Sequence, residues 1–234
     1  MAVHGQQFPL EVKHLQILEA EELYRFFHTG DEEIKALRGV SFSLSRGELV
    51  ALMGPSGSGK STLLACLAGI DEPDGGMVRA MTVPLTRKPE IEKARLRATF
   101  IGTMLQKNNL VAHLTVLENI CLAQSVLRKP DSSVAENILS RLGLANRAES
   151  IPSELSGGER ARAGLGVALA NAPTILLLDE PTGEVDAATE SAVLSALGQL
   201  ASEGTGIVMA THNAAVAKAA HRIVRMSDGK ILDV

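Results

Sequence analysis

The chain has 234 residues, of which 45% are hydrophobic and 21% are charged, a balance typical of a globular protein with one or two domains. Its formal net charge of −4 disfavours a nucleic-acid partner, which usually requires a basic excess. No stretch approaches the roughly 20 apolar residues that span a bilayer, so any membrane role is expected to depend on a partner protein. Cys66 and Cys121 lie far apart in apolar surroundings, which predicts buried thiols and a cytoplasmic location.

Strand and helix patterns alternate along most of the chain. The first ~45 residues mix alternating segments with a turn at 29–31, as an antiparallel sheet would. Helices are expected at 60–68, along an apolar stripe at 134–142 ended by Gly143, and along a stripe at 193–200 after a cap at Asp186. Short apolar runs predict buried strands at 48–53, 99–104, 174–178, 206–210 and 223–226, the last forming a hairpin with 231–234.

This order of elements predicts the fold class. Strands that alternate with helices favour an α/β fold with a parallel sheet covered on both faces. Between about 107 and 165 the alternation lapses and the pattern is mainly helical. We therefore expect a helical subdomain inserted into the α/β core.

A glycine-rich loop with the sequence Gly-Pro-Ser-Gly-Ser-Gly-Lys-Ser spans residues 54–61. It follows a predicted strand and opens a predicted helix, which is the context that a phosphate-binding loop needs. Its glycines allow successive backbone N–H groups to face one anion, and the helix N-terminus adds its positive end. Lys60 is expected to reach the β- and γ-phosphates of ATP, and the Ser61 hydroxyl to bind Mg²⁺. The residues expected to hold the nucleotide here are Gly54, Pro55, Ser56, Gly57, Ser58, Gly59, Lys60, Ser61 and Thr62.

Polar residues follow two of the predicted strands directly. Asp179 and Glu180 end the run at 174–178, and His212 follows the run at 206–210. Ligands of open α/β sheets lie beyond the carboxyl ends of the strands. Asp179 is therefore a candidate for Mg²⁺, directly or through water, and Glu180 for polarising an attacking water. The alternatives are two acids that merely end a strand at the surface, and a structural histidine.

The segment Leu-Ser-Gly-Gly-Glu at 155–159 opens a predicted helix. Ser156 and Glu159 have the spacing of a capping box, which is one interpretation. The other is a second phosphate contact, because Gly157 and Gly158 allow a phosphate to approach exposed N–H groups.

The phosphate loop, a glutamine, Leu-Ser-Gly-Gly-Glu, Asp-Glu-Pro and Thr-His occur in that order. Over roughly residues 10–232 the chain thereby resembles the ATP-binding-cassette (ABC) ATPases. The resemblance implies one domain with a P-loop NTPase (RecA-like) core and a mainly parallel sheet. It also implies an N-terminal antiparallel β subdomain and an inserted α-helical subdomain at about 107–165. Such cassettes pair head to tail, so that Ser156, Gly157, Gly158 and Glu159 of one copy face the ATP bound at Lys60 of the other.

The resemblance also assigns roles to single residues. Gln106 is implied to approach Mg²⁺ and to couple to a membrane partner, Glu180 to be the catalytic glutamate and His212 the switch histidine. Asp186 is implied to contact the opposite subunit. Phe27 is implied to stack on adenine, with Tyr24 and Phe26 nearby and a core aromatic as the alternative. The implied catalytic set is Glu180, His212, Lys60 and Gln106, and the implied metal set is Ser61, Gln106 and Asp179.

Within that family the chain is most similar to stand-alone cassettes for lipoprotein release, macrolide or peptide efflux, and cell-division signalling. The segments that carry this likeness are 30–32, 37–41, 114–119 and 179–183. The implied function is ATP hydrolysis that drives a separate integral membrane permease in export, at the cytoplasmic face of the membrane. The alternatives are a force-transmitting ATPase that regulates cell-wall enzymes at division and, more remotely, a nucleic-acid-linked ABC ATPase.

The chain departs from the family pattern at two places. Phe27 stands where the family usually has tyrosine, which keeps a stacking surface but loses a hydroxyl. After the signature, Gly164, Gly166 and Val167 replace bulkier residues and an arginine. A glycine inside a helix costs about 1 kcal/mol relative to alanine, so the helix either packs very closely there or is less rigid.

Overall fold

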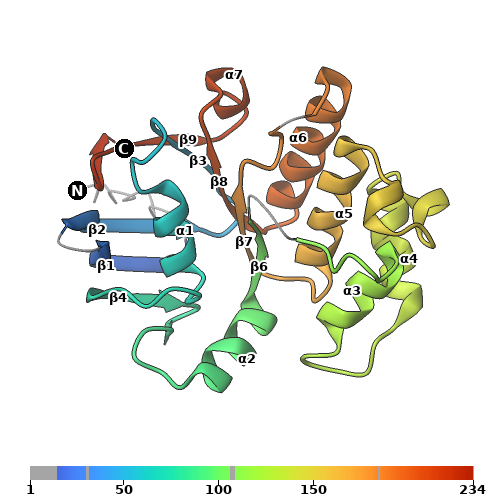
Figure 1. Cartoon of the computed structure of the whole chain (residues 1–234), viewed down its shortest axis with the longest axis horizontal. Helices are drawn as coiled ribbons and strands as arrows, with labels where there is room; N and C mark the ends of the chain where they lie inside the picture. The colour runs from blue at the N-terminus through green and yellow to red at the C-terminus, as the bar shows by residue number, and fades with distance from the viewer. Residues whose placement is uncertain (1–14, 30–31, 106–108, 184, 234) are drawn as a thin grey trace, which may run out of the picture.

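The computed structural model describes residues 15–29, 32–105, 109–183 and 185–233. A small antiparallel sheet stands beside a larger, mostly parallel sheet, and a group of helices lies on the far side of the larger sheet (Figure 1). The small sheet has the order β2-β1-β4-β5. Its strands are β1 (Gln16–Thr29), β2 (Glu32–Ser45), β4 (Gly75–Ala80) and β5 (Val83–Pro84).

The larger sheet has the order β10-β9-β3-β8-β7-β6. Its neighbours pair in parallel, except that β10 returns antiparallel beside β9. The glycine-rich loop leaves β3, which lies between β8 and β9. The strands are β3 (Leu49–Met53), β6 (Ile101–Met104), β7 (Ile175–Asp179), β8 (Gly206–Thr211), β9 (Arg222–Ser227) and β10 (Lys230–Asp233).

The central strands β3, β7 and β8 are buried on both faces, because each face of the larger sheet has its own core. In β7, Leu177 packs in the core that contains α1 and the small sheet, whereas Leu176 and Leu178 pack in the core that contains α5 and α6. Continuous apolar runs are the pattern of strands buried on both faces. The helices are α1 (Lys60–Leu67), α2 (Glu90–Phe100), α3 (Val116–Gln124), α4 (Ser132–Arg141), α5 (Gly157–Leu169), α6 (Ala187–Ser202) and α7 (Ala214–Ala217).

The expected fold class is confirmed, since both sheets and the helical region are present in the expected order. The strand expected at 99–104 is wrong in its first two residues, because α2 continues to Phe100 and β6 begins at Ile101. The sequence also predicted two buried thiols. Cys66 is fully buried, and burial raises the pKa of its thiol to about 12, but Cys121 is only partly buried.

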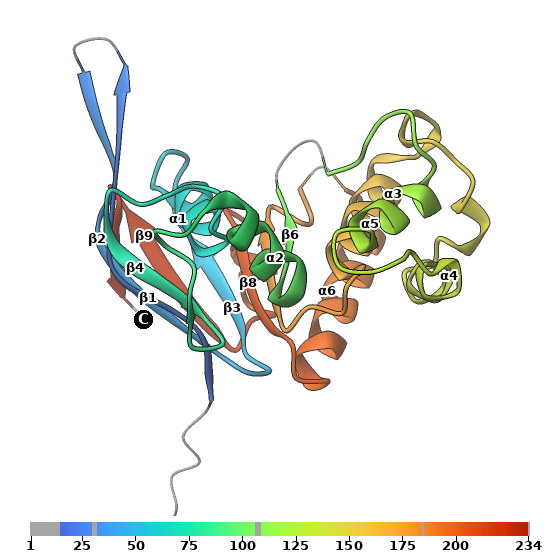
Figure 2. The same ribbon diagram turned by 90° about the horizontal axis from the view of Figure 1, so that it is seen from below.

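The helical region lies at one end of the molecule and contains α3, α4 and most of α5 (Figure 2). Helix α5 runs on to Leu169, beyond the boundary expected near 165. The glycines of α5 permit close packing: a Cβ on Gly166 would lie 3.2 Å from Ile120 Cδ1, and one on Gly164 would lie 3.2 Å from Asn109 Cβ. The structure thus favours the close-packing explanation for the glycines that follow the signature.

Candidate active site

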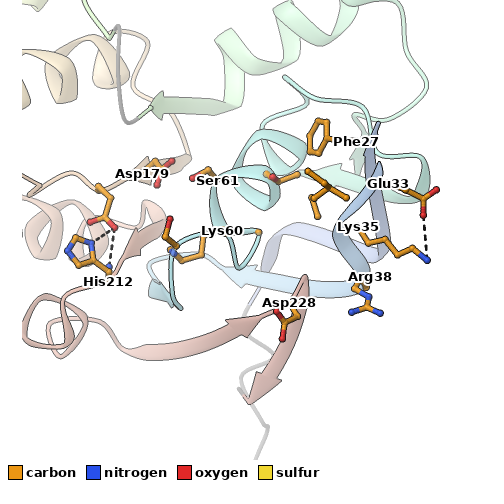
Figure 3. A pocket seen from close by; sticks show the side chains of 16 residues that line it. Phe27, Glu33, Lys35, Arg38, Lys60, Ser61, Asp179, His212 and Asp228 are labelled. Carbon is orange, nitrogen blue, oxygen red and sulfur yellow. Dashed lines mark hydrogen bonds and ion pairs between the residues drawn. The ribbon is translucent and has the colours of Figure 1, made fainter. Parts of the chain in front are cut away.

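A cavity of about 950 Å³ opens between the β1–β2 hairpin, the glycine-rich loop and the carboxyl ends of β7 and β8 (Figure 3). Its lining combines an aromatic ring at one end with a lysine, two acids and a histidine at the other. This layout gives space for a nucleotide, with apolar surface for a base and charged groups for phosphates. The lining residues are Phe27, Glu33, Ile34, Lys35, Ala36, Arg38, Ser56, Gly57, Gly59, Lys60, Ser61, Thr62, Asp179, Glu180, His212 and Asp228.

The shape of the loop depends on three glycines. Gly57 and Gly59 have φ values of +79° and +100°, a region that residues with a Cβ rarely adopt. A Cβ on Gly59 would lie 2.5 Å from the Ala36 carbonyl oxygen, and a Cβ on Gly54 would collide with the Met226 carbonyl oxygen. The loop therefore needs glycine at each of these positions to curl in front of α1.

Lys60 is the first residue of α1 and is 8% exposed. Its Nζ donates hydrogen bonds to the carbonyl oxygens of Gly54 at 2.8 Å and Pro55 at 3.0 Å. These bonds hold the ammonium group against the loop, at the edge of the cavity that it lines (Figure 3). Gly54, Pro55 and Ser58 are themselves absent from the described lining, so they shape the loop from behind.

Two acidic side chains at the end of β7 line the cavity. Asp179 is 5% exposed, and this burial raises the pKa of its carboxyl, while the nearby Ser61 hydroxyl opposes the rise. A buried carboxylate beside a hydroxyl at the mouth of a phosphate loop supplies the hard oxygen ligands that Mg²⁺ prefers. Ser61 and Asp179 therefore fit a magnesium ion, and such an ion would offset the cost of burying the Asp179 charge.

Glu180 and His212 form a close pair between adjacent strand ends. Glu180 Oε1 lies 2.7 Å from His212 Nδ1 and accepts a second hydrogen bond, of 3.1 Å, from the His212 backbone N–H. Glu180 has a left-handed backbone with a φ of +52°, an arrangement that costs of order 1–3 kcal/mol for a non-glycine residue. The Glu180 side chain is 15% exposed and that of His212 is 74% exposed, so the histidine ring is accessible to a ligand.

Phe27 lines the cavity at the end opposite the acids (Figure 3). Tyr24 and Phe26, although both belong to the described part of β1, are not among the lining residues. The guanidinium carbon of Arg25 lies 4.6 Å from the centroid of the Phe27 ring. Geometry thus favours Phe27 among the three aromatic candidates, and it adds Arg25, which the sequence interpretation did not consider.

The Leu-Ser-Gly-Gly-Glu segment forms the N-terminus of α5. Both halves of a capping box are present: the Glu159 backbone N–H donates to Ser156 Oγ at 3.2 Å, and the Ser156 backbone N–H donates to Glu159 Oε2 at 2.8 Å. That N–H and the Arg147 guanidinium lower the pKa of Glu159 to about 2. A Cβ on Gly158 would lie 2.8 Å from the Thr189 side chain. None of the described residues that line the nucleotide cavity belongs to α5.

Gln106 lies outside the described residues, so its predicted contact with Mg²⁺ and with a membrane partner stays a prediction. The residues on either side of it are joined, because the Leu105 backbone N–H donates to Asn109 Oδ1 at 2.7 Å. Farther along, Asn119 is 3% exposed; it accepts from the Val111 N–H at 2.7 Å and donates to the Leu114 carbonyl at 3.1 Å. Two asparagines that the sequence analysis did not single out thus shape the path from β6 to α3.

Asp186 caps α6. Its carboxylate accepts from the Thr189 backbone N–H at 2.9 Å and from the Thr189 hydroxyl at 2.8 Å, as the sequence predicted for the helix start. The predicted contact of Asp186 with an opposite subunit stays a prediction.

A glycine-rich loop between β3 and α1, with acids at the end of β7 and a histidine at the end of β8, defines a P-loop NTPase. A family model described as "ABC transporter" matches residues 37–183. The chain belongs to the ABC transporter family and is an ABC ATPase.

Curated relatives agree with this placement. The chain is 38% identical over 222 residues to the lipoprotein-releasing system ATP-binding protein LolD of Paramagnetospirillum magneticum, covering 93% of this chain and 98% of that protein. It is 40% identical over 219 residues to LolD of Maricaulis maris, with 92% and 96% covered. It is also 36% identical over 222 residues to the macrolide export ATP-binding/permease protein MacB of Mannheimia succiniciproducens, covering 94% of this chain but 34% of that protein.

Solved structures show the same fold. The dimeric structure of the ABC transporter cassette MJ0796 superimposes with a TM-score of 0.89 at 32% identity, covering 93% of this chain and 97% of that one. A post-hydrolysis dimer of MJ0796 with bound ADP and Pi gives a TM-score of 0.88 at 32% identity, with the same coverage.

Proposed function

We propose that this chain is the ATP-hydrolysing subunit of a membrane export complex, and that it works by closing two copies head to tail around two ATP molecules. The observation that carries the proposal is the separation of two phosphate-binding features. The loop before α1 lines the cavity, whereas Gly157 and Gly158, the first two residues of α5, do not. In Figure 1, α1 and α5 lie on opposite sides of the larger sheet. The start of α5 therefore cannot contact a nucleotide in the cavity of its own chain. In a head-to-tail pair, however, α5 of a second copy can contact that nucleotide.

The chemistry of α5 suits that contact. Ser156 and Gly157 are exposed at a helix N-terminus, where the positive end of the helix dipole favours an anion. The capping box leaves these residues ordered before any phosphate arrives. Closing a second copy over the cavity would also exclude water from the phosphates, which strengthens every charged contact there.

Within each cavity the residues have separable tasks. Lys60 would contact the β- and γ-phosphates, exchanging its carbonyl partners for phosphate oxygens. Ser61 and Asp179 would hold Mg²⁺, which neutralises phosphate charge when it is bound. Glu180 would accept a proton from the attacking water, and His212, already hydrogen-bonded to it, would hold the carboxylate toward the γ-phosphate.

The partner that we propose is an integral membrane permease. Among the described residues, no helix has the length and apolar character needed to cross a membrane. The relatives' names join an ATP-binding protein to a lipoprotein-releasing system and to a permease for macrolide export. We place the chain at the cytoplasmic face of the membrane, bound through such a permease, with a lipoprotein, peptide or drug as the exported class.

The permease is tested by purifying the tagged chain from detergent-solubilised native membranes. We expect a polytopic membrane protein to co-purify and to change the ATPase rate of the chain. The chain purified alone is the control. An ATPase rate that responds to no membrane protein would count against the transport role.

The head-to-tail arrangement is tested by Ser156→Asp. Aspartate is as good an N-cap as serine, so α5 and the stability of the fold are expected to persist. Its carboxylate would, however, face the triphosphate of the other copy, and we expect the ATPase rate to fall by about tenfold or more. The affinity of the single subunit for ATP should not change, because its own cavity is intact.

The matched control is Thr115→Asp, since Thr115 caps α3 with the same capping box. This variant should keep the ATPase rate of the unmodified chain. Undiminished hydrolysis by Ser156→Asp would show that the α5 segment does not meet a phosphate.

A further inference from the structure

The wall that carries Phe27 extends beyond the sheet that supports it. Strand β4 pairs with β1 only as far as Tyr24, opposite Gly75, whereas the β1–β2 pairing continues to Thr29 and Glu32. Figure 2 shows this hairpin arm projecting past the rest of the small sheet. Phe27 lies in the arm, so β4 does not fix its position over the cavity.

Beyond the end of the β4 pairing, a cluster of charged residues supports the arm. The Arg25 guanidinium donates from Nε and Nη2 to the two carboxylate oxygens of Asp71, at 2.9 and 2.8 Å, and from Nη1 to Asp74 at 3.3 Å. Asp74 also accepts from the Phe26 backbone N–H at 2.7 Å. The side chains of Arg25 and Asp71 are 21% and 24% exposed. A partly buried, bidentate pair of this kind has fixed geometry.

Both acids lie in the segment that follows α1. Helix α1 begins at Lys60, beside the phosphate loop. The Arg25 cluster therefore connects the arm that bears Phe27 to the element that bears the phosphate loop. Through α1, this cluster links the end of the cavity that carries Phe27 to the end that carries the phosphate loop.

The guanidinium also covers one face of the aromatic ring, 4.6 Å from its centroid. Arg25, Asp71 and Asp74 are not among the described lining residues of the cavity, whereas Phe27 is. The covered face thus points away from the cavity. The opposite face of the Phe27 ring remains for a nucleotide base.

We propose that Arg25 is a positioning residue for nucleotide binding: anchored by Asp71 and Asp74, it backs the Phe27 ring and holds it where the base of ATP stacks. This proposal rests on the proposed function, because it assumes that the cavity binds ATP. In this proposal the affinity for the triphosphate comes from the loop, and part of the affinity for the base comes from Arg25 acting through Phe27. Stacking of one base on an aromatic ring is strong enough for such a contribution to be measured.

The test compares ATP with inorganic tripolyphosphate, which lacks the base, by calorimetric titration of Arg25→Met. We expect the Kd for ATP to rise about three- to tenfold, a part of the full stacking contribution, and the Kd for tripolyphosphate to stay unchanged. In a Phe27→Ala background, Arg25→Met should have no further effect on ATP. Arg25→Lys, which keeps the positive charge near Asp71, should recover part of the lost affinity.

Arg79→Met is the matched control, because Arg79 pairs with Glu21 at 2.7 Å in the same sheet and is distant in register from Phe27. It should leave both ligands unaffected. Equal weakening of ATP and tripolyphosphate by Arg25→Met, or no weakening of either, would overturn the positioning role. Failure of the proposed function would look different, since Lys60→Ala would then leave the binding of both ligands unchanged.

Discussion

Glu180→Gln is expected to lower the ATPase rate by roughly 10²- to 10⁴-fold, the range that a general base usually contributes. Glutamine has the same shape, so it can keep the left-handed backbone and a hydrogen bond with His212. It lacks the negative charge that would accept a proton from water. Because Glu180 is not needed to hold the phosphates in this account, the affinity for ATP should remain within about threefold of the unmodified value, well under the 1.4 kcal/mol of a tenfold change.

The rate is measured as phosphate release at saturating Mg-ATP, and the affinity by calorimetry. Glu136→Gln, at an exposed position of α4, makes the same chemical change outside the cavity and should hydrolyse ATP normally. A Glu180→Gln variant that keeps a tenth or more of the rate would mean that another group activates the water.

Lys60→Ala is expected to act on binding itself. A hydrogen bond to a charged group contributes about 1.5–3 kcal/mol, so we expect the Kd for ATP to rise roughly 10- to 150-fold. The substitution also removes the bonds to the Gly54 and Pro55 carbonyls, but Gly54 is only partly buried and Pro55 is exposed, so water can replace the lysine there. The fold should therefore persist, as circular dichroism can verify.

Lys35→Ala is the matched control for Lys60→Ala. Lys35 lines the same cavity from the hairpin arm, is exposed, and lies 3.5 Å from Glu33. Its removal should change the Kd for ATP by less than about threefold, because exposed charges contribute little. If Lys35→Ala raised the Kd for ATP more than Lys60→Ala did, the triphosphate would have to bind near the hairpin arm and not at the phosphate loop, which would contradict the account.

The sequence predicts best where structure follows from a local pattern. The runs at β3, β7 and β8 are apolar without interruption, because each of these strands is buried on both faces, and the helix starts at Lys60 and Asp186 carry their own signals. The sequence predicts no helix at α2, because this segment is rich in charge and, of its described apolar residues, only Leu96 and Phe100 pack against the core. Its surface is instead linked by ion pairs such as Lys93–Glu90 and Arg97–Glu90.

The residues of the candidate site also fall into those that a local motif predicts and those that only the structure reveals. The phosphate loop and the acids at the end of β7 could be predicted, because a short motif positions each of them relative to one strand end. Arg25 could not, because Asp71 and Asp74 are 46 and 49 residues away in the sequence. The choice of Phe27 over Tyr24 and Phe26 also needed the structure, since all three lie within four residues of β1.

The central claim is that two chains complete each other's sites, and the mass of the Glu180→Gln variant in solution tests it most directly. Light scattering after size exclusion, with Mg-ATP in the running buffer, should give twice the 24.7 kDa of the chain. With ADP, or with Ser156→Asp added, the mass should return to that of one chain. A Glu180→Gln protein that binds ATP with full occupancy and stays at 24.7 kDa would contradict the account.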